Sequence, residues 1–98
     1  MSFPFPEKVG FTVYSKSGCV YCERAKHLLA QQCEPITTIH CDSFLEIRKD
    51  DFLAFIHNLT QTHHRTFPII FHNDCFIGGF NELKSFIDKK NAFDNVLF

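Results

Sequence analysis

Hydrophobic positions recur first with the period of a strand and then with the period of a helix. At the start of residues 9–15 every second residue is apolar, which predicts a short strand. Ala25, Leu28 and Leu29 are then spaced by three and four residues, so they lie on one side of a helix. We expect this helix over residues 20–32, because Pro35 follows it and the residue before a proline is disfavoured in the helical region.

A second strand and a second helix follow along the chain. Residues 36–41 are rich in β-branched side chains, which predicts a strand. Two strands joined by one helix of this length form a parallel, right-handed βαβ unit. Asp42 or Ser43 then offers an N-cap, and apolar residues recur at helical spacing from Leu45 to Leu59.

The remainder of the chain predicts a hairpin and a closing helix. Residues 67–71 and 75–77 are two short apolar runs separated by an Asn-Asp turn, which indicates an antiparallel hairpin. Two glycines break the pattern, and Asn81 can cap a last helix. The element order β-α-β-α-β-β-α predicts an α/β thioredoxin-like fold, a four-stranded mixed sheet with helices on both faces.

Composition and charge agree with one domain over residues 1–98, in which residues 1–8 form a loosely held lead-in. The chain is 45% hydrophobic and has thirteen phenylalanines, so aromatic rings must fill much of the core. A net charge of −1 gives no reason to expect nucleic acid, and no apolar run approaches the roughly 20 residues of a membrane span. An odd count of five cysteines and the lack of a signal-peptide pattern favour a cytoplasmic protein, and we expect it to be a monomer.

The most informative chemistry lies between the first strand and the first helix. Cys19 and Cys22 form a Cys-x-x-Cys motif where the helix begins, close enough for a disulfide. Unpaired N–H groups, the helix dipole and the nearby Lys16 all favour a thiolate there. A thiol whose pKa falls from about 8.5 to about 5 gains roughly 30-fold in thiolate at pH 7. Because nucleophilicity falls in parallel, the net gain is as a leaving group, which suits an enzyme that accepts and releases sulfur adducts.

Two further stretches carry candidate binding chemistry. Pro68 can adopt the cis form, which would leave the backbone of Phe67 free to pair with an extended peptide. The glycine pair before the last helix leaves the N–H groups of Phe80 and Asn81 able to hold a carboxylate. An ordinary trans proline and a simple tight turn are the alternatives. Together with the thiols, these features describe a pocket for a small acidic thiol peptide such as glutathione.

The cysteines also allow two other interpretations. One is a pair of half-buried helix cysteines with no chemical role. The other is a zinc site, since the chain has three further cysteines and six histidines. Structural zinc usually takes a second closely spaced ligand pair, and no second Cys-x-x-Cys occurs in this sequence. Cys33, Cys41 and Cys75 are interpreted as ordinary small apolar residues. The histidines at positions 27, 40, 57 and 72 are interpreted as structural or exposed.

Three motifs occur in a fixed order, Lys16-x-x-Cys19-Val20-Tyr21-Cys22, then Arg65-Thr66-Phe67-Pro68, then Cys75-Phe76-Ile77-Gly78-Gly79-Phe80-Asn81-Glu82-Leu83. With these motifs the chain resembles a dithiol glutaredoxin over roughly residues 9–90. The resemblance implies reduction of glutathione mixed disulfides and protein disulfides, with glutathione as reductant and no metal required. It implies that Cys19 is the nucleophile and Cys22 the resolving thiol. It also implies glutathione contacts from Lys16, Tyr21, Arg65, Thr66, Phe67, Pro68, Gly79, Phe80 and Asn81.

The resemblance has departures and leaves alternatives. Val20 stands where the family usually has proline, Phe67 replaces a more usual valine, and Asn81 stands where Asp or Ser is frequent. One alternative is a carrier of a [2Fe–2S] cluster that Cys19 and glutathione would bridge between two chains. Another is a thioredoxin-like protein reductant, which the absence of tryptophan makes the weaker hypothesis. The expected partners are glutathione and disulfide-containing or glutathionylated proteins, with neither nucleic acid nor membrane.

Overall fold

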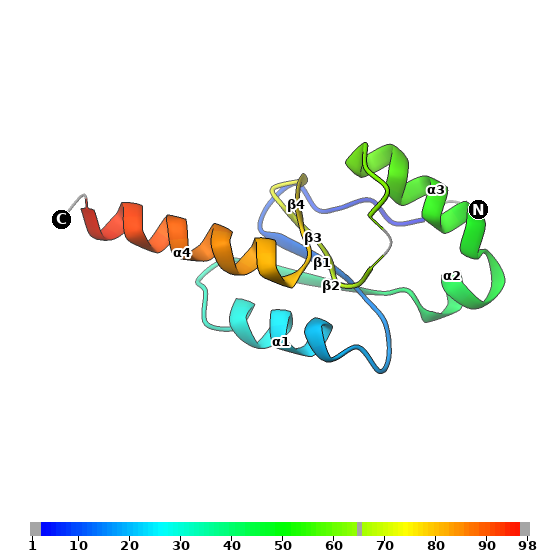
Figure 1. Ribbon diagram of the computed structural model, residues 1–98, viewed down its shortest axis with the longest axis horizontal. Helices are drawn as coiled ribbons and strands as arrows, with labels where there is room; N and C mark the ends of the chain where they lie inside the picture. The colour runs from blue at the N-terminus through cyan, green and yellow to red at the C-terminus, as the bar shows by residue number, and fades with distance from the viewer. Residues whose placement is uncertain (1–2, 65, 97–98) are drawn as a thin grey trace.

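The computed structural model describes residues 3–64 and 66–96, and their side chains as far as residue 91. The centre of the protein is a four-stranded sheet in the order β2-β1-β3-β4 (Figure 1). The strands are β1 (Phe11–Ser15), β2 (Ile36–His40), β3 (Ile69–His72) and β4 (Cys75–Gly78). β1 and β2 are parallel, whereas β1 with β3 and β3 with β4 are antiparallel. The predicted thioredoxin-like mixed sheet is therefore confirmed.

Helices cover both faces of this sheet. They are α1 (Val20–Leu29), α2 (Asp42–Ile47), α3 (Lys49–Thr60) and α4 (Phe80–Val96). α1 and α4 lie on one side of the sheet, and α2 and α3 lie on the other (Figure 1). None of the helices within residues 3–64 and 66–96 is both long and apolar enough to cross a membrane.

The single helix predicted from Leu45 to Leu59 is two helices, so this prediction is wrong. Arg48 separates α2 from α3 with φ −136° and ψ 46°, outside the helical region. The bend lets rings from both helices reach one residue, because the Phe3 ring lies 5.1 Å from Phe44 and 5.3 Å from Phe52. The Arg48 guanidinium covers the same Phe3 ring at 4.7 Å. The element order becomes β-α-β-α-α-β-β-α.

β1 begins two residues later than predicted and is buried at every position. Gly10 turns the chain just before it with φ 83°, and Val9 remains 70% exposed. The predicted alternation does separate the two faces, since Phe11 and Val13 belong to one core cluster and Tyr14 to the other. Both faces are buried because helices cover each of them, as is usual for a central strand of this fold class.

The hydrophobic core is divided by the sheet into two clusters of different composition. On the α1–α4 side the buried residues are Phe11, Val13, Ala25, Leu29, Ile70, Leu83 and Ile87. On the α2–α3 side they are Phe3, Tyr14, Cys41, Phe52, Ile56, Ile69 and Phe71. Aromatic rings dominate the second cluster, in agreement with the phenylalanine-rich composition.

The N-terminal segment contributes to the aromatic cluster. Phe3 is only 7% exposed, and the Tyr14 hydroxyl donates a hydrogen bond to the carbonyl oxygen of Pro4 at 2.7 Å. The sequence predicts a loosely held lead-in here, whereas the structure packs it against the core at Phe3. The difference arises because Phe3 meets rings from residues more than forty positions away, which no local pattern indicates.

The helix ends also differ from the predictions. α1 ends at Leu29 rather than residue 32, since the N–H groups of Gln31 and Gln32 bond carbonyls three residues back. Asp42 does not cap α2 but accepts a hydrogen bond from the Ser17 N–H at 2.9 Å. Asn81 does not cap α4 either, because that helix already begins at residue 80.

Candidate active site

The two cysteines of the motif form a disulfide at the start of α1. Their Cα atoms are 5.2 Å apart. Cys19 is the N-cap, and its Sγ accepts a hydrogen bond from the Cys22 N–H at 3.2 Å. Cys22 is fully buried, whereas Cys19 is partly exposed. The sulfur at the helix start is therefore the one an incoming molecule can reach, and the second sulfur is shielded behind it.

A short turn places Cys19 between β1 and α1. Gly18 has φ 68°, a left-handed conformation that glycine adopts without a steric cost. The preceding Ser17 N–H donates to the Asp42 carboxylate at the start of α2. This hydrogen bond holds the pKa of the Asp42 carboxyl below its usual range. The turn is thus tied to an element twenty-five residues further along the chain.

The loop before β3 lies against the reactive pair. The Phe67–Pro68 peptide bond is cis, which confirms the isomer considered for Pro68. The carbonyl oxygen of Phe67 lies 3.6 Å from Cys19 Sγ. The Lys16 ammonium lies 5.6 Å from the centroid of the Phe67 ring, so the predicted basic residue reaches over this loop. The cis-proline loop therefore forms one wall beside the accessible sulfur.

A cavity of about 330 Å³ joins this loop to the starts of α1 and α4. Its lining contains most of the predicted glutathione-binding residues, namely Tyr21, Thr66, Phe67, Pro68, Gly79, Phe80 and Asn81. Lys16 does not line it, although it reaches the Phe67 ring. Arg65 lies outside the described residues. We call this cavity the ligand groove.

The start of α4 brings backbone amide groups of its first turn to the ligand groove. The Gly79 N–H donates to Glu82 Oε1 at 2.8 Å, and the Leu83 N–H bonds the Gly79 carbonyl at 3.0 Å. Between them, the N–H groups of Phe80 and Asn81 belong to the first turn, where a helix has no internal partner for them. Together with the helix dipole, they make this end of the groove suitable for an anionic group.

Two groove residues were not predicted from the sequence. Glu82 follows Gly79 by three residues, and this capping-box spacing could have indicated its hydrogen bond. His64 lines the groove as well, with its ring 5.4 Å from that of Phe76. Its Nε2 is buried and has no hydrogen-bond partner among the residues that the structure describes. A histidine in a polar loop carries no sequence signal that would indicate this position.

The Tyr21 ring forms the rim of the groove on the α1 side. It is 51% exposed and lies 5.7 Å from the ring of Phe80. The Arg24 guanidinium lies over the Tyr21 ring, 5.2 Å from its centroid. The Tyr21–Phe80 pair therefore closes the groove between the two helices and presents an aromatic edge to solvent.

The cysteines outside the motif lie in different surroundings. Cys41 is fully buried, and burial raises the pKa of its thiol to about 12. Cys33 and Cys75 are exposed free thiols. Within residues 3–64 and 66–96, no three or more histidine, cysteine or carboxylate side chains are grouped so that they could hold a metal ion.

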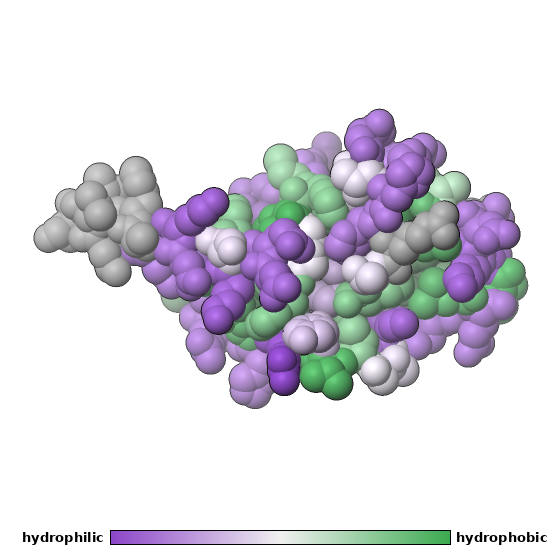
Figure 2. Space-filling model, in the orientation of Figure 1, coloured by the Kyte–Doolittle hydropathy of each residue, from purple (hydrophilic) through white to green (hydrophobic). Residues whose placement is uncertain are grey.

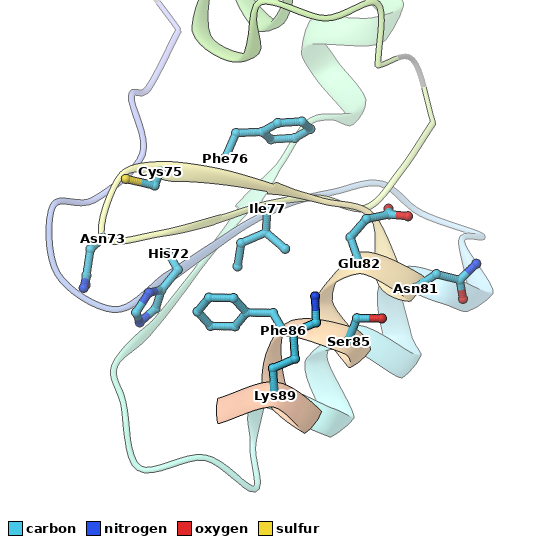
Figure 3. A pocket seen from close by; sticks show the side chains of 10 residues that line it. All are labelled: His72, Asn73, Cys75, Phe76, Ile77, Asn81, Glu82, Ser85, Phe86 and Lys89. Carbon is cyan, nitrogen blue, oxygen red and sulfur yellow. The ribbon is translucent and has the colours of Figure 1, made fainter. Parts of the chain in front are cut away.

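A larger cavity of about 590 Å³ lies between β4 and α4 (Figure 3). Ile77 and Phe86 project into it from the two elements, with Cys75 near one end and Asn81 and Glu82 at the other. Neither cysteine of the disulfide lines this cavity. It therefore adjoins the ligand groove only through the first turn of α4.

The fold and the dithiol at the helix start are those of the thioredoxin-like class of proteins. The family model for glutaredoxin matches residues 11–77. Glutaredoxin-2 of Schizosaccharomyces pombe is 35% identical over 72 residues, which are 74% of this chain and 62% of that protein. The chain thus spans less than two-thirds of that relative. It belongs to the glutaredoxin family.

Solved structures agree with this assignment. The dithiolic glutaredoxin 2-C-Grx1 of Trypanosoma brucei brucei is 31% identical, with a TM-score of 0.66 over 92% of this chain and 88% of that one. A glutaredoxin–glutathione complex from buckwheat is also 31% identical, with a TM-score of 0.64 over 82% of this chain and 70% of that one.

Proposed function

We propose that this protein uses glutathione to reduce glutathione mixed disulfides and protein disulfides. The observation that carries the proposal is the ligand groove, which brings the cis-proline loop and the unpaired amides of α4 together beside Cys19. A similar protein from buckwheat has been solved as a complex with glutathione, which supports the same ligand here. We further propose that the protein acts as a monomer in a reducing compartment, where Cys33, Cys41 and Cys75 remain thiols.

Glutathione has one thiol and two carboxylates, and the groove offers a counterpart for each. The backbone of Phe67 would pair with the cysteine part of the tripeptide, as an added strand pairs with a sheet edge. The amides of Phe80 and Asn81 would hold one carboxylate at the start of α4. Lys16, whose ammonium lies 5.6 Å from the centroid of the Phe67 ring, would attract the other carboxylate. The sulfur of the ligand would then lie over Cys19.

With a glutathione mixed disulfide, the reaction needs only one protein thiol. The Cys19 thiolate attacks the glutathione sulfur, a new Cys19–glutathione disulfide forms, and the thiolate of the substrate protein leaves and takes a proton from water. A second glutathione, as thiolate, attacks this adduct. Glutathione disulfide forms and Cys19 leaves as the thiolate. The substrate gains two electrons, and two molecules of glutathione end as one disulfide.

With a protein disulfide, the second thiol is required. Cys19 attacks one sulfur and becomes joined to the substrate, whose other sulfur leaves as a thiolate. Cys22 lies directly behind Cys19 and attacks it, which releases the reduced substrate and leaves the Cys19–Cys22 disulfide seen here. Two molecules of glutathione then reduce this disulfide. The Cys22 N–H and the positive end of the α1 dipole stabilise the departing Cys19 thiolate.

The roles of the two cysteines can be tested with matched serine variants. In a glutathione reductase-coupled assay, Cys19→Ser should lose at least about a thousandfold in turnover of a glutathione mixed disulfide, because the nucleophile is gone. Cys22→Ser should keep most of that activity and lose the reduction of a protein disulfide. An active Cys19→Ser protein would contradict the proposal, as would a wild-type protein that turns over no glutathione substrate.

A further inference from the structure

A second groove lies beside the reactive cysteine, between α1 and α4. It encloses about 530 Å³ and is lined by Val20, Glu23, Arg24, His27, Leu28, Gln31, Phe80, Lys84 and Asp88. We call it the α1–α4 groove. It begins at Val20, the residue that follows Cys19, and it shares Phe80 with the ligand groove. The Tyr21 ring, which lines the ligand groove alone, lies 5.7 Å from the shared Phe80 ring.

The end of the α1–α4 groove nearest Cys19 is apolar and open to solvent. Val20 is 62% exposed at the first turn of α1 and Phe80 also lines the groove, whereas Leu28 adds an apolar residue about two turns further along α1. Apolar surface over the start of α1 is visible in Figure 2. The mechanism above uses neither Val20 nor Leu28. An exposed apolar surface that adjoins a reactive site is the usual mark of a surface that binds a partner.

The charged side chains of the groove leave an excess of positive charge. Glu23 is neutralised by Lys26, whose Nζ lies 2.9 Å from its carboxylate. Of the other charged residues in the lining, Arg24 and Lys84 are positive and Asp88 is negative. No ion pair to Lys84 occurs in the part of the chain that the structure describes. An apolar lining with this charge suits a peptide that carries an apolar side chain and an acidic one.

We propose that the α1–α4 groove binds the polypeptide segment next to the reacting cysteine of a protein substrate. This inference rests on the proposed function, because it concerns the protein part of a glutathione mixed disulfide. Val20 and Leu28 are eight residues apart on α1, which corresponds to about 12 Å along the helix axis. An extended peptide covers that length with about four residues. The groove would therefore bind an apolar and an acidic side chain of the substrate, both within about four positions of its reacting cysteine.

The position of the groove fits the first step of the reaction. When Cys19 attacks the glutathione sulfur, the leaving thiolate belongs to the substrate protein and is joined to that same sulfur. Glutathione occupies the ligand groove at that moment, so the segment of the substrate protein must lie outside the ligand groove. Its sulfur is bonded to the glutathione sulfur that Cys19 attacks, so the segment must also lie close to Cys19. The α1–α4 groove meets both conditions, because it begins at Val20, next to Cys19, and shares Phe80 with the ligand groove.

Glutathionylated peptides test this proposal directly. One peptide carries leucine and aspartate within four residues of its glutathionylated cysteine, and a second carries alanine at both positions. Each peptide is made in two versions, one with this pair of residues before the cysteine and one with the pair after it. The mixed disulfide of glutathione with 2-mercaptoethanol serves as the small substrate. In one of these two versions, we expect kcat/KM for the leucine–aspartate peptide to exceed that for the alanine peptide by about tenfold. The reason is that the groove would partly bury the leucine side chain of the peptide.

Charge reversal on the groove adds a second measurement. Lys84→Glu should lower kcat/KM for the aspartate peptide by about two- to fivefold, the range of an exposed charge pair, and a peptide with lysine in place of aspartate should restore it. Lys49→Glu makes the same charge change at the start of α3, on the opposite side of the sheet, and should leave the peptides in their wild-type order. Both variants should turn over the small substrate at the wild-type rate.

The possible outcomes separate the two proposals. Equal kcat/KM for all peptides with the wild-type protein would overturn the α1–α4 groove as a substrate site, while turnover of the small substrate would leave the proposed function standing. Equal losses in Lys84→Glu and Lys49→Glu would also overturn it, since the effect would then be one of net charge. Failure of the wild-type protein to turn over the small substrate would overturn the proposed function itself.

Discussion

Two helices of this protein, α1 and α2, have a cysteine as their N-cap residue, and these two cysteines lie in opposite chemical surroundings. Cys19 precedes α1 with φ −106° and ψ 104°, and its sulfur turns back to accept the Cys22 N–H. Cys41 precedes α2 with φ −103° and ψ 5°, and its side chain makes no cap. Its thiol instead donates to the Ile39 carbonyl at 3.4 Å within the aromatic core. The first sulfur is accessible and oxidised, and the second is buried and free.

This comparison shows that a helix start alone does not activate a thiol. The favourable effect of unpaired amides reaches a sulfur only when the backbone of the N-cap directs the side chain toward them. The pKa of Cys41 is raised to about 12, chiefly by burial, with Asp42 adding to the rise. Burial disfavours the thiolate more than the short α2 can favour it. Accessibility and local backbone conformation therefore decide which of the two cysteines is reactive.

The largest expected effect is a difference in alkylation rate between these two cysteines. At pH 7 a thiol with a pKa of about 12 is ionised only to about 0.001%, against about 3% for an ordinary thiol. In the reduced protein, iodoacetamide should therefore modify Cys19 more than about a thousandfold faster than Cys41. Mass spectrometry of peptides after timed quenching measures both rates. Comparable rates in the folded protein would contradict the contrast between the two N-caps.

The burial of Cys41 should depend on the aromatic cluster around it. Phe52 is fully buried in that cluster, so Phe52→Ala should lower the free energy of unfolding by about 3–5 kcal/mol. Leu29→Ala makes a comparable deletion in the other cluster and should cost about 2–5 kcal/mol. Urea unfolding followed by circular dichroism measures both. We expect only Phe52→Ala to expose Cys41 beyond what the loss of global stability explains.

Replacing the buried thiol itself should have a smaller effect. Cys41→Ser keeps a donor for Ile39 but buries a more polar group, so we expect a loss of about 1–2 kcal/mol and wild-type activity. Because folding raises the pKa of Cys41 from 9.0 to about 12, its contribution to stability is complete below pH 9 and declines as the pH rises toward 12. Wild type should therefore lose more stability than Cys41→Ser over this alkaline range. Parallel curves would contradict the raised pKa.

The smallest expected effect concerns Asp42, which follows Cys41 and holds the turn before Cys19. Folding lowers the pKa of Asp42 below its ordinary value of 3.8, so the ionised form favours the folded state. This contribution is complete above pH 3.8 and is lost as the pH falls through the lower, folded value. Asp42→Asn should therefore destabilise the protein slightly at pH 7, and this difference should shrink as the pH falls below 3.8. A constant difference in melting temperature across this range would refute the role of the Ser17 hydrogen bond.

The types of most elements and the place of the dithiol were predictable from the sequence because they depend on neighbouring residues. The spacing of Ala25, Leu28 and Leu29 indicates a helix, and the turn before Cys19 sets its start. The hairpin follows equally from two apolar runs and the Asn-Asp turn between them. These patterns involve residues that are close together in the sequence, so the sequence alone is enough to recognise them.

The break at Arg48, the burial of Phe3 and the contrast between Cys19 and Cys41 arose only in the tertiary structure. Each depends on contacts between residues far apart in sequence, such as Phe3 with Phe52 or Ser17 with Asp42. The ligand groove is the same kind of feature, since its lining comes from three separate segments and includes the unpredicted His64 and Glu82. A local pattern can place a cysteine at a helix start, but only long-range packing determines whether its sulfur meets solvent or a closed core.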